Sequence, residues 1–281
     1  MPKATQVLLF EFCFLPYLVY IRDQVIVLKK ISVREYDRTV FMYGRQHGLI
    51  MATARGAARP KSKQCARLEP LSFAEVMVAK GKSFDHLAVA GPVEAEVDFK
   101  THEGRSADSD LCVRAVTGAF ADLFLSLVKP GISDERLFAL WGELIVALRG
   151  PRTGLTVLRA QLMFAIASLR LMDLLGYGPA LSVCTHCRQP SGPTDAWYAP
   201  EHGGLVCASC RLSWEGFLVP ANAHALALLR FARKAPLSDL LRVSLPVDVG
   251  VNALRLIREV WKHAPLDREP HGLETISALL V

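Results

Sequence analysis

The sequence predicts an α+β multidomain protein in which a small N-terminal β-barrel precedes an α-helical part that carries a four-cysteine insert. Three observations predict this order. Short β-rich stretches fill residues 24 to about 99, and after Ser106 the apolar residues recur at the helical spacing of three and four. Farther along, a turn-rich segment with two C-x2-C pairs interrupts the helical pattern.

The first 23 residues are expected to be an N-terminal extension that precedes the barrel. The apolar run at residues 7–21 is shorter than the roughly twenty residues that span a bilayer, and Glu11 and Pro16 interrupt it. It also has no small-x-small cleavage site before Arg22. We therefore expect a globular, cytoplasmic protein without stable membrane association, and a start codon assigned too far upstream would account for residues 1–23.

Residues 24–101 are expected to form the barrel. β-branched and aromatic residues gather there in short runs that Gly- and Pro-containing turns separate. The expected strands are residues 25–32, 39–44, 48–54, 71–79 and 88–99. Five strands of this length favour a small barrel.

The barrel segment is strongly basic. Residues 29–82 contain twelve cations and four anions, whereas residues 83–122 contain three cations and eight anions. Such an asymmetry favours an anionic partner such as nucleic acid, although a solvated basic surface is the alternative. The main candidates for DNA contact lie around one Gly- and Pro-containing loop: Arg55, Arg59, Lys61, Lys63 and Arg67.

Other residues of the barrel segment support the same chemistry. Cations neutralise phosphates and release counterions, while aromatic faces stack on bases. The weaker cationic candidates are Arg34, Arg38 and Arg45. The aromatic side chains considered available for stacking are Phe41, Tyr43 and His47.

Three helices are expected in a helical domain at residues 102–180. The first ends at Pro130-Gly131 and carries on one face Leu111, Ala115, Ala119, Leu123 and Leu127. The second follows a Ser133-Asp134-Glu135 cap and buries Leu137, Leu140, Trp141, Leu144, Ile145 and Leu148. The third ends at Gly176 and carries Leu158, Leu162, Ala165, Ile166, Leu169, Met172 and Leu175. Residues 216–281 are expected to form a C-terminal helical part, with helices at 221–234 and 249–262.

Four of the seven cysteines form two matched pairs: Cys184, Cys187, Cys207 and Cys210. Nineteen residues separate the pairs, which is the spacing of a four-thiolate zinc site. Each pair places two sulfurs on one side of a tight turn, and two such turns complete a tetrahedron. We therefore predict a zinc ribbon at residues 181–215 with Trp197 and Tyr198 in a short strand; a redox pair and coincidental thiols are the alternatives. Four thiolates leave no open position on the ion, so one structural Zn²⁺ is expected.

The remaining cysteines and nearby histidines have simpler interpretations. Cys13, Cys65 and Cys112 are expected to be small core residues. His186 and His202 lie near the cysteine pairs, but four cysteines already satisfy the metal, so we expect these rings beside the site or on the surface.

Signatures of catalysis are missing, and we expect no enzyme activity. Gly81-Lys82-Ser83 resembles the end of a phosphate-binding loop, but Val76 stands where that loop needs its first glycine. The H-x-E and P-C-x-x-C elements of a nucleobase deaminase do not occur together. The sequence also has no G-x-S-x-G, H-E-x-x-H or G-x-G-x-x-G motif.

The combined motifs resemble the bacterial RecO family of recombination and repair proteins. HGLIMATARGAARPKSK holds a glycine turn at Gly48 and an element similar to the family's, formed by Ala54, Gly56, Ala57 and Ser62. LMDLLGYGPALSVCTHC at 171–187 and GGLVCASC at 203–210 resemble the family's leucine-rich helix and its two cysteine turns. The resemblance covers residues 24 to about 265.

This resemblance implies an N-terminal OB-fold β-barrel, a helical domain and an inserted four-cysteine zinc ribbon in a non-enzymatic DNA-binding protein. Such a protein binds single- and double-stranded DNA, anneals strands, works with RecR, contacts the C-terminal tail of single-strand-binding protein and helps load RecA in the RecF pathway. It is cytoplasmic and associates with the nucleoid during repair. The chain departs from the family pattern at Glu69, where a neutral residue is usual, and in lacking a basic Lys-Ser element near its end. The competing interpretation is a zinc-ribbon protein-interaction adaptor whose DNA contact is incidental.

Overall fold

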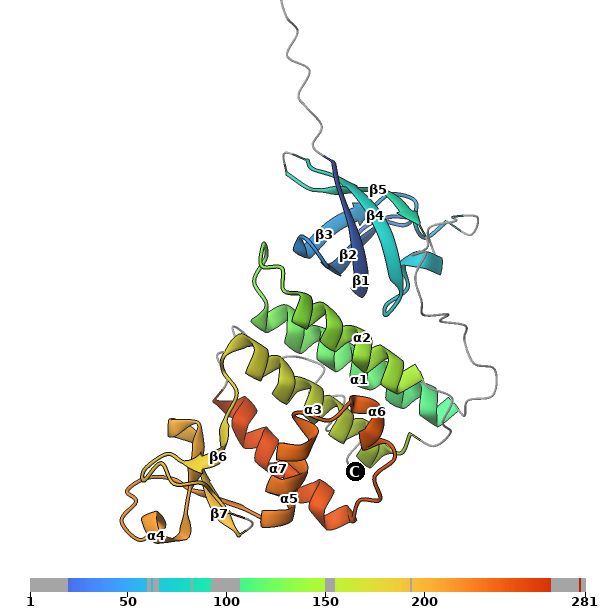
Figure 1. Cartoon of the computed structure of the whole chain (residues 1–281). Coiled ribbons are helices and arrows are strands. Elements are labelled where there is room, and N and C mark those ends of the chain that lie inside the picture. The colour runs from blue at the N-terminus through green and yellow to red at the C-terminus, as the bar shows by residue number, and fades with distance from the viewer. Residues whose placement is uncertain are drawn as a thin grey trace, which may run out of the picture.

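The computed structural model describes residues 20–59, 62, 66–81, 83–91, 107–149, 155–192, 194–263 and 278. A closed barrel lies at one end of the molecule, helices fill the middle, and a small sheet lies at the other end (Figure 1). The predicted order of barrel, helices, four-cysteine insert and further helices is therefore confirmed.

Five strands form the barrel: β1 (Tyr20–Ser32), β2 (Arg38–Gly44), β3 (Gly48–Ala54), β4 (Phe73–Ala79) and β5 (His86–Gly91). They close in the order β1-β2-β3-β5-β4. The long β1 pairs with β4 through its first half and with β2 through its second half, and a register shift at Val27–Lys29 lets it bend between them. Aliphatic residues fill the interior, among them Val25, Val40, Met42, Ile50, Val76 and Val78.

The first and last strands differ from the prediction. β1 begins at Tyr20, so residues 20–23 belong to the barrel and not to the expected N-terminal extension. β5 covers His86–Gly91, and the rest of the expected last strand lies outside the described residues. The start of β1 was missed because Arg22 and Asp23 interrupt the apolar pattern there.

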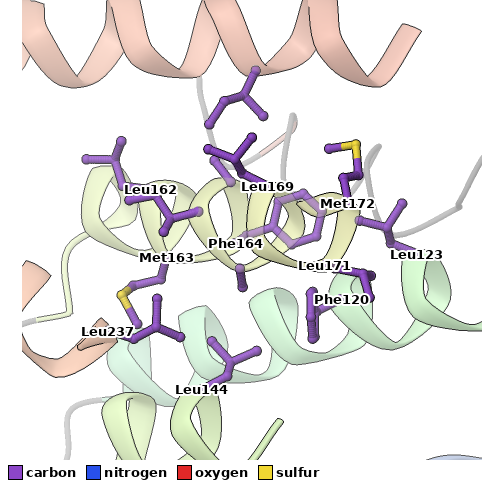
Figure 2. Close-up of a cluster of buried hydrophobic side chains, with 14 of the residues drawn as sticks. Phe120, Leu123, Leu144, Leu162, Met163, Phe164, Leu169, Leu171, Met172 and Leu237 are labelled. Atoms are coloured by element: carbon purple, nitrogen blue, oxygen red, sulfur yellow. The ribbon is translucent and has the colours of Figure 1, made fainter. Parts of the chain in front are cut away.

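The helical domain consists of α1 (Ala107–Leu127), α2 (Glu135–Arg149), α3 (Val157–Leu175), α5 (Ala223–Ala232), α6 (Leu237–Leu240) and α7 (Val247–Lys262). Helix α3 is buried almost all round, from Ala160 to Met172 except at Arg170. Its side chains face those of α1, α2 and α6, including Phe120, Leu123, Leu144 and Leu237 (Figure 2). Among the described residues, no helix is both long and apolar enough to cross a membrane.

The expected helix ends and faces are present with one correction. The Asp134 carboxylate accepts a hydrogen bond from the Arg136 N–H at 2.8 Å at the start of α2, and Gly176 ends α3 in the left-handed conformation with φ 85°. All six apolar residues expected on the inner face of α2 are buried. Leu111, near the start of α1, is however 56% exposed, whereas Ala115, Ala119, Leu123 and Leu127 of the same face are buried.

The barrel meets the helical domain at the β2–β3 turn. The Tyr43 ring is fully buried and lies edge-on to Phe124 with 5.0 Å between centroids. Its hydroxyl donates to the Ile132 carbonyl at 3.3 Å and accepts from the Asp134 N–H at 3.0 Å. Gly48 has φ 65°, and a Cβ there would lie 2.1 Å from the Ile132 oxygen, so only glycine fits this junction.

The insert forms a four-stranded sheet of β6 (Ala180–Cys184), β7 (Ala196–Ala199), β8 (Gly204–Val206) and β9 (Val219–Ala221), in the order β6-β8-β7-β9. A short helix, α4 (Ala208–Arg211), follows β8. Trp197 and Tyr198 lie on β7, as predicted. Because β6 and β8 are neighbours and run parallel, the cysteine turns that follow them lie at the same edge of the sheet.

Candidate metal centre and nucleic-acid interface

The first cysteine pair occupies a tight turn after β6. Cys184 is the last residue of the strand, and its carbonyl accepts a hydrogen bond from the Arg188 N–H at 3.0 Å. Arg188 has φ 61°, a left-handed conformation that reverses the chain just after Cys187. The Gln189 carbonyl then accepts from the Cys184 N–H at 2.9 Å, so the backbone fixes both thiols on one side of the turn.

The second pair spans the start of α4. Cys207 precedes the helix, Cys210 lies in its single turn, and the Cys207 carbonyl accepts from the Arg211 N–H at 3.0 Å. The two turns are joined by the Thr185 N–H, which donates to the Leu205 carbonyl at 2.7 Å. This bond holds the end of β6 against β8 and brings the two pairs together.

All four sulfurs lie within 4.8 Å of one another, and the Sγ atoms of Cys187 and Cys207 are 3.9 Å apart. In a tetrahedral four-thiolate site the sulfurs are about 2.3 Å from the metal and hence about 3.8 Å from each other. Among the described residues, these cysteines are the one group of His, Cys, Asp or Glu side chains that converges in this way. The geometry therefore fits one metal ion held by Cys184, Cys187, Cys207 and Cys210.

The backbone around Cys184 favours its ionised form. Burial would raise the pKa of this thiol, but the N–H groups of Cys187, Cys207 and His186 donate to the sulfur and lower the pKa to about 6. The Cys207 N–H to Cys184 Sγ distance is 3.4 Å. Since metals bind the thiolate, the turn prepares this ligand for coordination.

The histidines near the cysteines lie outside this group. The His202 ring is edge-on to Trp214 at 4.8 Å between centroids, and the His186 ring is edge-on to the same indole at 6.3 Å. The prediction that they lie beside the site or on the surface is confirmed, because both are exposed. Of the three cysteines expected in the core, Cys112 is buried, whereas Cys13 and Cys65 lie outside the described residues.

A second candidate site lies at the end of the barrel that faces away from the helices. We call residues 33–37, 55–59 and 83–85 the distal loops. The Tyr36 carbonyl accepts from the Ala58 N–H at 3.0 Å, the Asp37 carboxylate accepts from the Gly56 N–H at 2.8 Å, and the Asp85 carbonyl accepts from the Thr53 N–H at 2.9 Å. These bonds hold the three loops together beyond the open end of the β2–β3 hairpin.

Three predicted cations are exposed on the distal loops. Arg34 and Arg55 form no ion pair with any residue that the structure describes. The Arg59 guanidinium lies 5.7 Å from the centroid of the Tyr36 ring. Beside them, Arg38 is half-buried and donates to the carbonyls of Arg34, Glu35 and Asp37, which holds the first loop in shape.

The other predicted cations are placed differently. The Arg67 guanidinium donates to the Ala90 carbonyl at 2.9 Å, although the residue is exposed. Arg45 lies at the opposite end of the hairpin, where its guanidinium binds both carboxylate oxygens of Glu135 at 2.6 and 2.9 Å. Lys61 and Lys63 lie outside the described residues. The structure therefore brings Arg34, Arg38, Arg55 and Arg59 together, but not Arg45.

The expectation that Tyr43 is available for stacking is wrong, because its ring is buried against Phe124. His47 lies at the same turn as Arg45, and its Nδ1 is 3.0 Å from the buried Asp23 carboxylate. The exposed aromatic rings of the distal loops are instead Tyr36 and Phe84. Both lie in turns between strands, next to Asp37 and Ser83, where no alternation indicates which side chains are exposed.

The sequence matches two family models that together cover most of the chain. The model described as recombination protein O N terminal matches residues 18–95, and the one described as recombination protein O C terminal matches residues 109–263. The first match corresponds to the barrel, and the second covers the helices and the cysteine ribbon.

Three curated relatives share the description DNA repair protein RecO. A DNA repair protein RecO from Heliobacterium modesticaldum is 34% identical over 92% of this chain and 88% of its own length. A DNA repair protein RecO from Desulforudis audaxviator is 26% identical over 90% of this chain and 94% of its own length. A third, from Dehalococcoides mccartyi, is 22% identical over 92% of this chain and 95% of its own length.

Proposed function

The chain belongs to the RecO family of DNA repair proteins, and from this premise we propose that it is a non-enzymatic DNA-binding mediator of recombinational repair. In this proposal it binds and anneals DNA strands and helps load RecA at gaps coated by single-strand-binding protein, as part of the RecF pathway. The observation that carries the proposal is the cluster of exposed arginines on the distal loops of a barrel that matches the family's N-terminal model.

The distal loops are proposed to hold the sugar-phosphate backbone. Arg34, Arg55 and Arg59 are exposed on loops whose backbone is fixed by hydrogen bonds, so little conformational freedom is lost when they bind. Lys61, Lys63 and Arg67 follow in the same connection of the sequence, and the proposal includes them as further phosphate contacts. Each cation that neutralises a phosphate releases counterions, which makes binding salt-dependent and independent of sequence. Arg45 has no such role in this proposal because Glu135 pairs with it.

The metal is proposed to be one structural Zn²⁺. Four thiolates satisfy a tetrahedral ion completely, and a closed site of this kind contributes to folding and not to catalysis. The small sheet of the ribbon needs such support because its strands β8 and β9 have three residues each. A bound Zn²⁺ would link the two cysteine turns by binding two thiolates from each.

The proposed partners beyond DNA are RecR and the C-terminal tail of single-strand-binding protein, in the cytoplasm at the nucleoid. The proposed domain limits remain 102–180 for the helical domain, 181–215 for the ribbon and 216–281 for the C-terminal helical part. The barrel domain is extended to Tyr20, where β1 begins.

The second candidate function is a protein-interaction adaptor. It is favoured by Leu212 and Phe217, which follow the second cysteine pair and are 91% and 64% exposed. Such side chains on a small metal ribbon are typical of a protein contact. The two functions differ in whether the barrel surface itself holds DNA.

Charge reversal on the barrel distinguishes them. We expect Arg59→Glu combined with Lys61→Glu and Lys63→Glu to weaken the binding of single-stranded DNA whatever its base sequence. The slope of log K against the logarithm of the salt concentration should become less steep by about 2. The measurement is fluorescence anisotropy of a labelled oligonucleotide over a salt series, with an annealing assay beside it. The matched control reverses three exposed arginines of the helical domain: Arg242, Arg255 and Arg258.

Because both triple variants change the net charge equally, a loss confined to the barrel variant supports the proposal. Unchanged affinity and salt dependence in the barrel variant would place the DNA contact elsewhere and favour the adaptor.

A further inference from the structure

The distal loops expose two aromatic rings next to their arginines. Tyr36 is 41% exposed and Phe84 is 67% exposed, and the structure records no ring–ring contact for either within its described part. The barrel interior is filled by its own aliphatic side chains, so neither ring is needed to complete that core. Both rings therefore present apolar area that another molecule could cover.

The loops that carry these rings are held in place by the barrel. The Tyr36 carbonyl accepts from the Ala58 N–H at 3.0 Å, and the next residue, Asp37, caps Gly56. Phe84 precedes Asp85, whose carboxylate binds the Lys80 ammonium at 2.6 Å and whose carbonyl accepts from Thr53. The rings therefore lie on loops with a fixed backbone, which lowers the entropy lost on stacking.

Positive charge accompanies the rings. The Arg59 guanidinium lies over the Tyr36 ring. Arg34 is exposed in the same loop as Tyr36, and Arg55 is exposed in the same loop as Arg59. A phosphate bound by Arg59 would place the attached base beside Tyr36. The combination of a cation for the backbone with a ring for the base is the arrangement by which proteins hold single strands without reading their sequence.

Duplex DNA cannot use such rings in the same way, because its bases already stack on each other and only their edges face the grooves. The arginines would contact the phosphates of either form. The rings add affinity only when bases are unpaired, so they distinguish the two forms of DNA.

We infer that Tyr36 and Phe84 stack on unpaired bases, so that the distal loops select single-stranded over double-stranded DNA. This inference rests on the proposed DNA-binding function and specifies the form of DNA that the barrel holds.

The test uses the full chain with Tyr36→Leu and Phe84→Leu, singly and together. Leucine keeps apolar area but has no flat face, and Tyr36→Phe keeps the ring. The matched controls are Tyr177→Leu and Phe217→Leu, which replace rings that are 52% and 64% exposed on other parts of the molecule. The probes are oligothymidine of about twenty nucleotides, a duplex of equal length, and an abasic strand with the same number of phosphates.

Each leucine variant on the distal loops should bind oligothymidine about 5- to 100-fold more weakly than the wild type, since this is the range for losing one stacked base. Its affinity for the duplex and for the abasic strand should change less than about twofold. Tyr36→Phe and both controls should bind like the wild type.

Equal losses on oligothymidine and on the abasic strand would show that the substitutions disturb the arginines, and would overturn stacking. Unchanged binding to oligothymidine would overturn it as well. In both cases the proposed function would stand if the Arg59, Lys61 and Lys63 charge reversals still weaken binding. A wild-type protein that binds none of the probes would contradict the proposed function itself.

Discussion

Tyr43 joins the barrel to the helical domain through both parts of its side chain. Its ring lies against Phe124 of α1, and its hydroxyl donates to the Ile132 carbonyl and accepts from the Asp134 N–H just before α2. The pKa of this phenol is raised, chiefly because the ring is buried, so the hydroxyl remains a donor throughout the physiological pH range. The residue has no free face to offer to DNA.

Removing only the hydroxyl should therefore affect stability and leave DNA binding unchanged. We expect Tyr43→Phe to lower the free energy of unfolding by about 1 kcal/mol, because the Asp134 N–H and the Ile132 carbonyl lose their partner. Chemical denaturation gives the value, and oligonucleotide anisotropy gives the affinity. Tyr36→Phe removes the same group from an exposed ring and should leave the unfolding free energy unchanged, whereas a Tyr43→Phe variant with weakened DNA binding would contradict this assignment.

The residue scale also shows what a sequence pattern leaves open. Alternation along residues 39–44 predicts a strand correctly, but Met42, Tyr43 and Gly44 are all buried. Met42 points into the barrel, whereas Tyr43 is covered from outside by the helical domain. A strand face that a distant helix covers cannot be recognised from the strand alone, and this is why Tyr43 was expected on the surface.

At the scale of the element, the cysteine ribbon depends on contacts that local propensity does not supply. β8 has three residues and begins with Gly204. It pairs in parallel with β6, although β7 lies between the two strands in the sequence. The cysteine spacing nevertheless predicts correctly that the four sulfurs converge, because the ligands of one ion would share one geometric requirement. The short strands β8 and β9 and the single turn of α4 were not expected.

Breaking the metal site should unfold the ribbon alone. We expect Cys187→Ser to remove the bound metal and to expose the backbone amides of residues 180–221, because without an ion the two cysteine turns keep only hydrogen bonds between them. Metal content by native mass spectrometry and amide hydrogen exchange of the same sample give the result. Cys112→Ser changes a cysteine in α1 and should keep the metal.

The barrel provides an internal control in the same exchange experiment. The barrel and its junction at Tyr43 lie at the other end of the molecule, so their exchange should not change (Figure 1). A Cys187→Ser protein that lacks metal and still protects the ribbon amides would show that the ion has no structural role.

At the scale of the whole molecule, the order of parts could be predicted from the sequence, and their packing could not. The change from β-rich stretches to helical spacing near residue 106 and the two cysteine pairs mark the parts correctly. The junction between barrel and helices arises from pairs far apart in sequence, such as Arg45 with Glu135 and Lys29 with Asp122. Both of these cations belong to the basic segment, and composition cannot show that they face the helical domain.

The arrangement leaves one end of the barrel for a ligand. The β2–β3 turn is closed by the helical domain, whereas the distal loops carry exposed arginines and rings at the opposite end. The ribbon lies beyond the helices, far from that surface (Figure 1). We therefore propose that DNA lies on the distal loops and that the metal maintains a separate part of the molecule.

Photocrosslinking tests this claim most directly. A single strand that contains 4-thiothymidine is irradiated with the full-length protein, and the modified peptides are identified by mass spectrometry. We predict crosslinks in residues 33–37, 55–67 and 83–85, with Tyr36 and Phe84 among the modified residues. Crosslinks confined to the ribbon at residues 180–221 or to the helices would contradict the account.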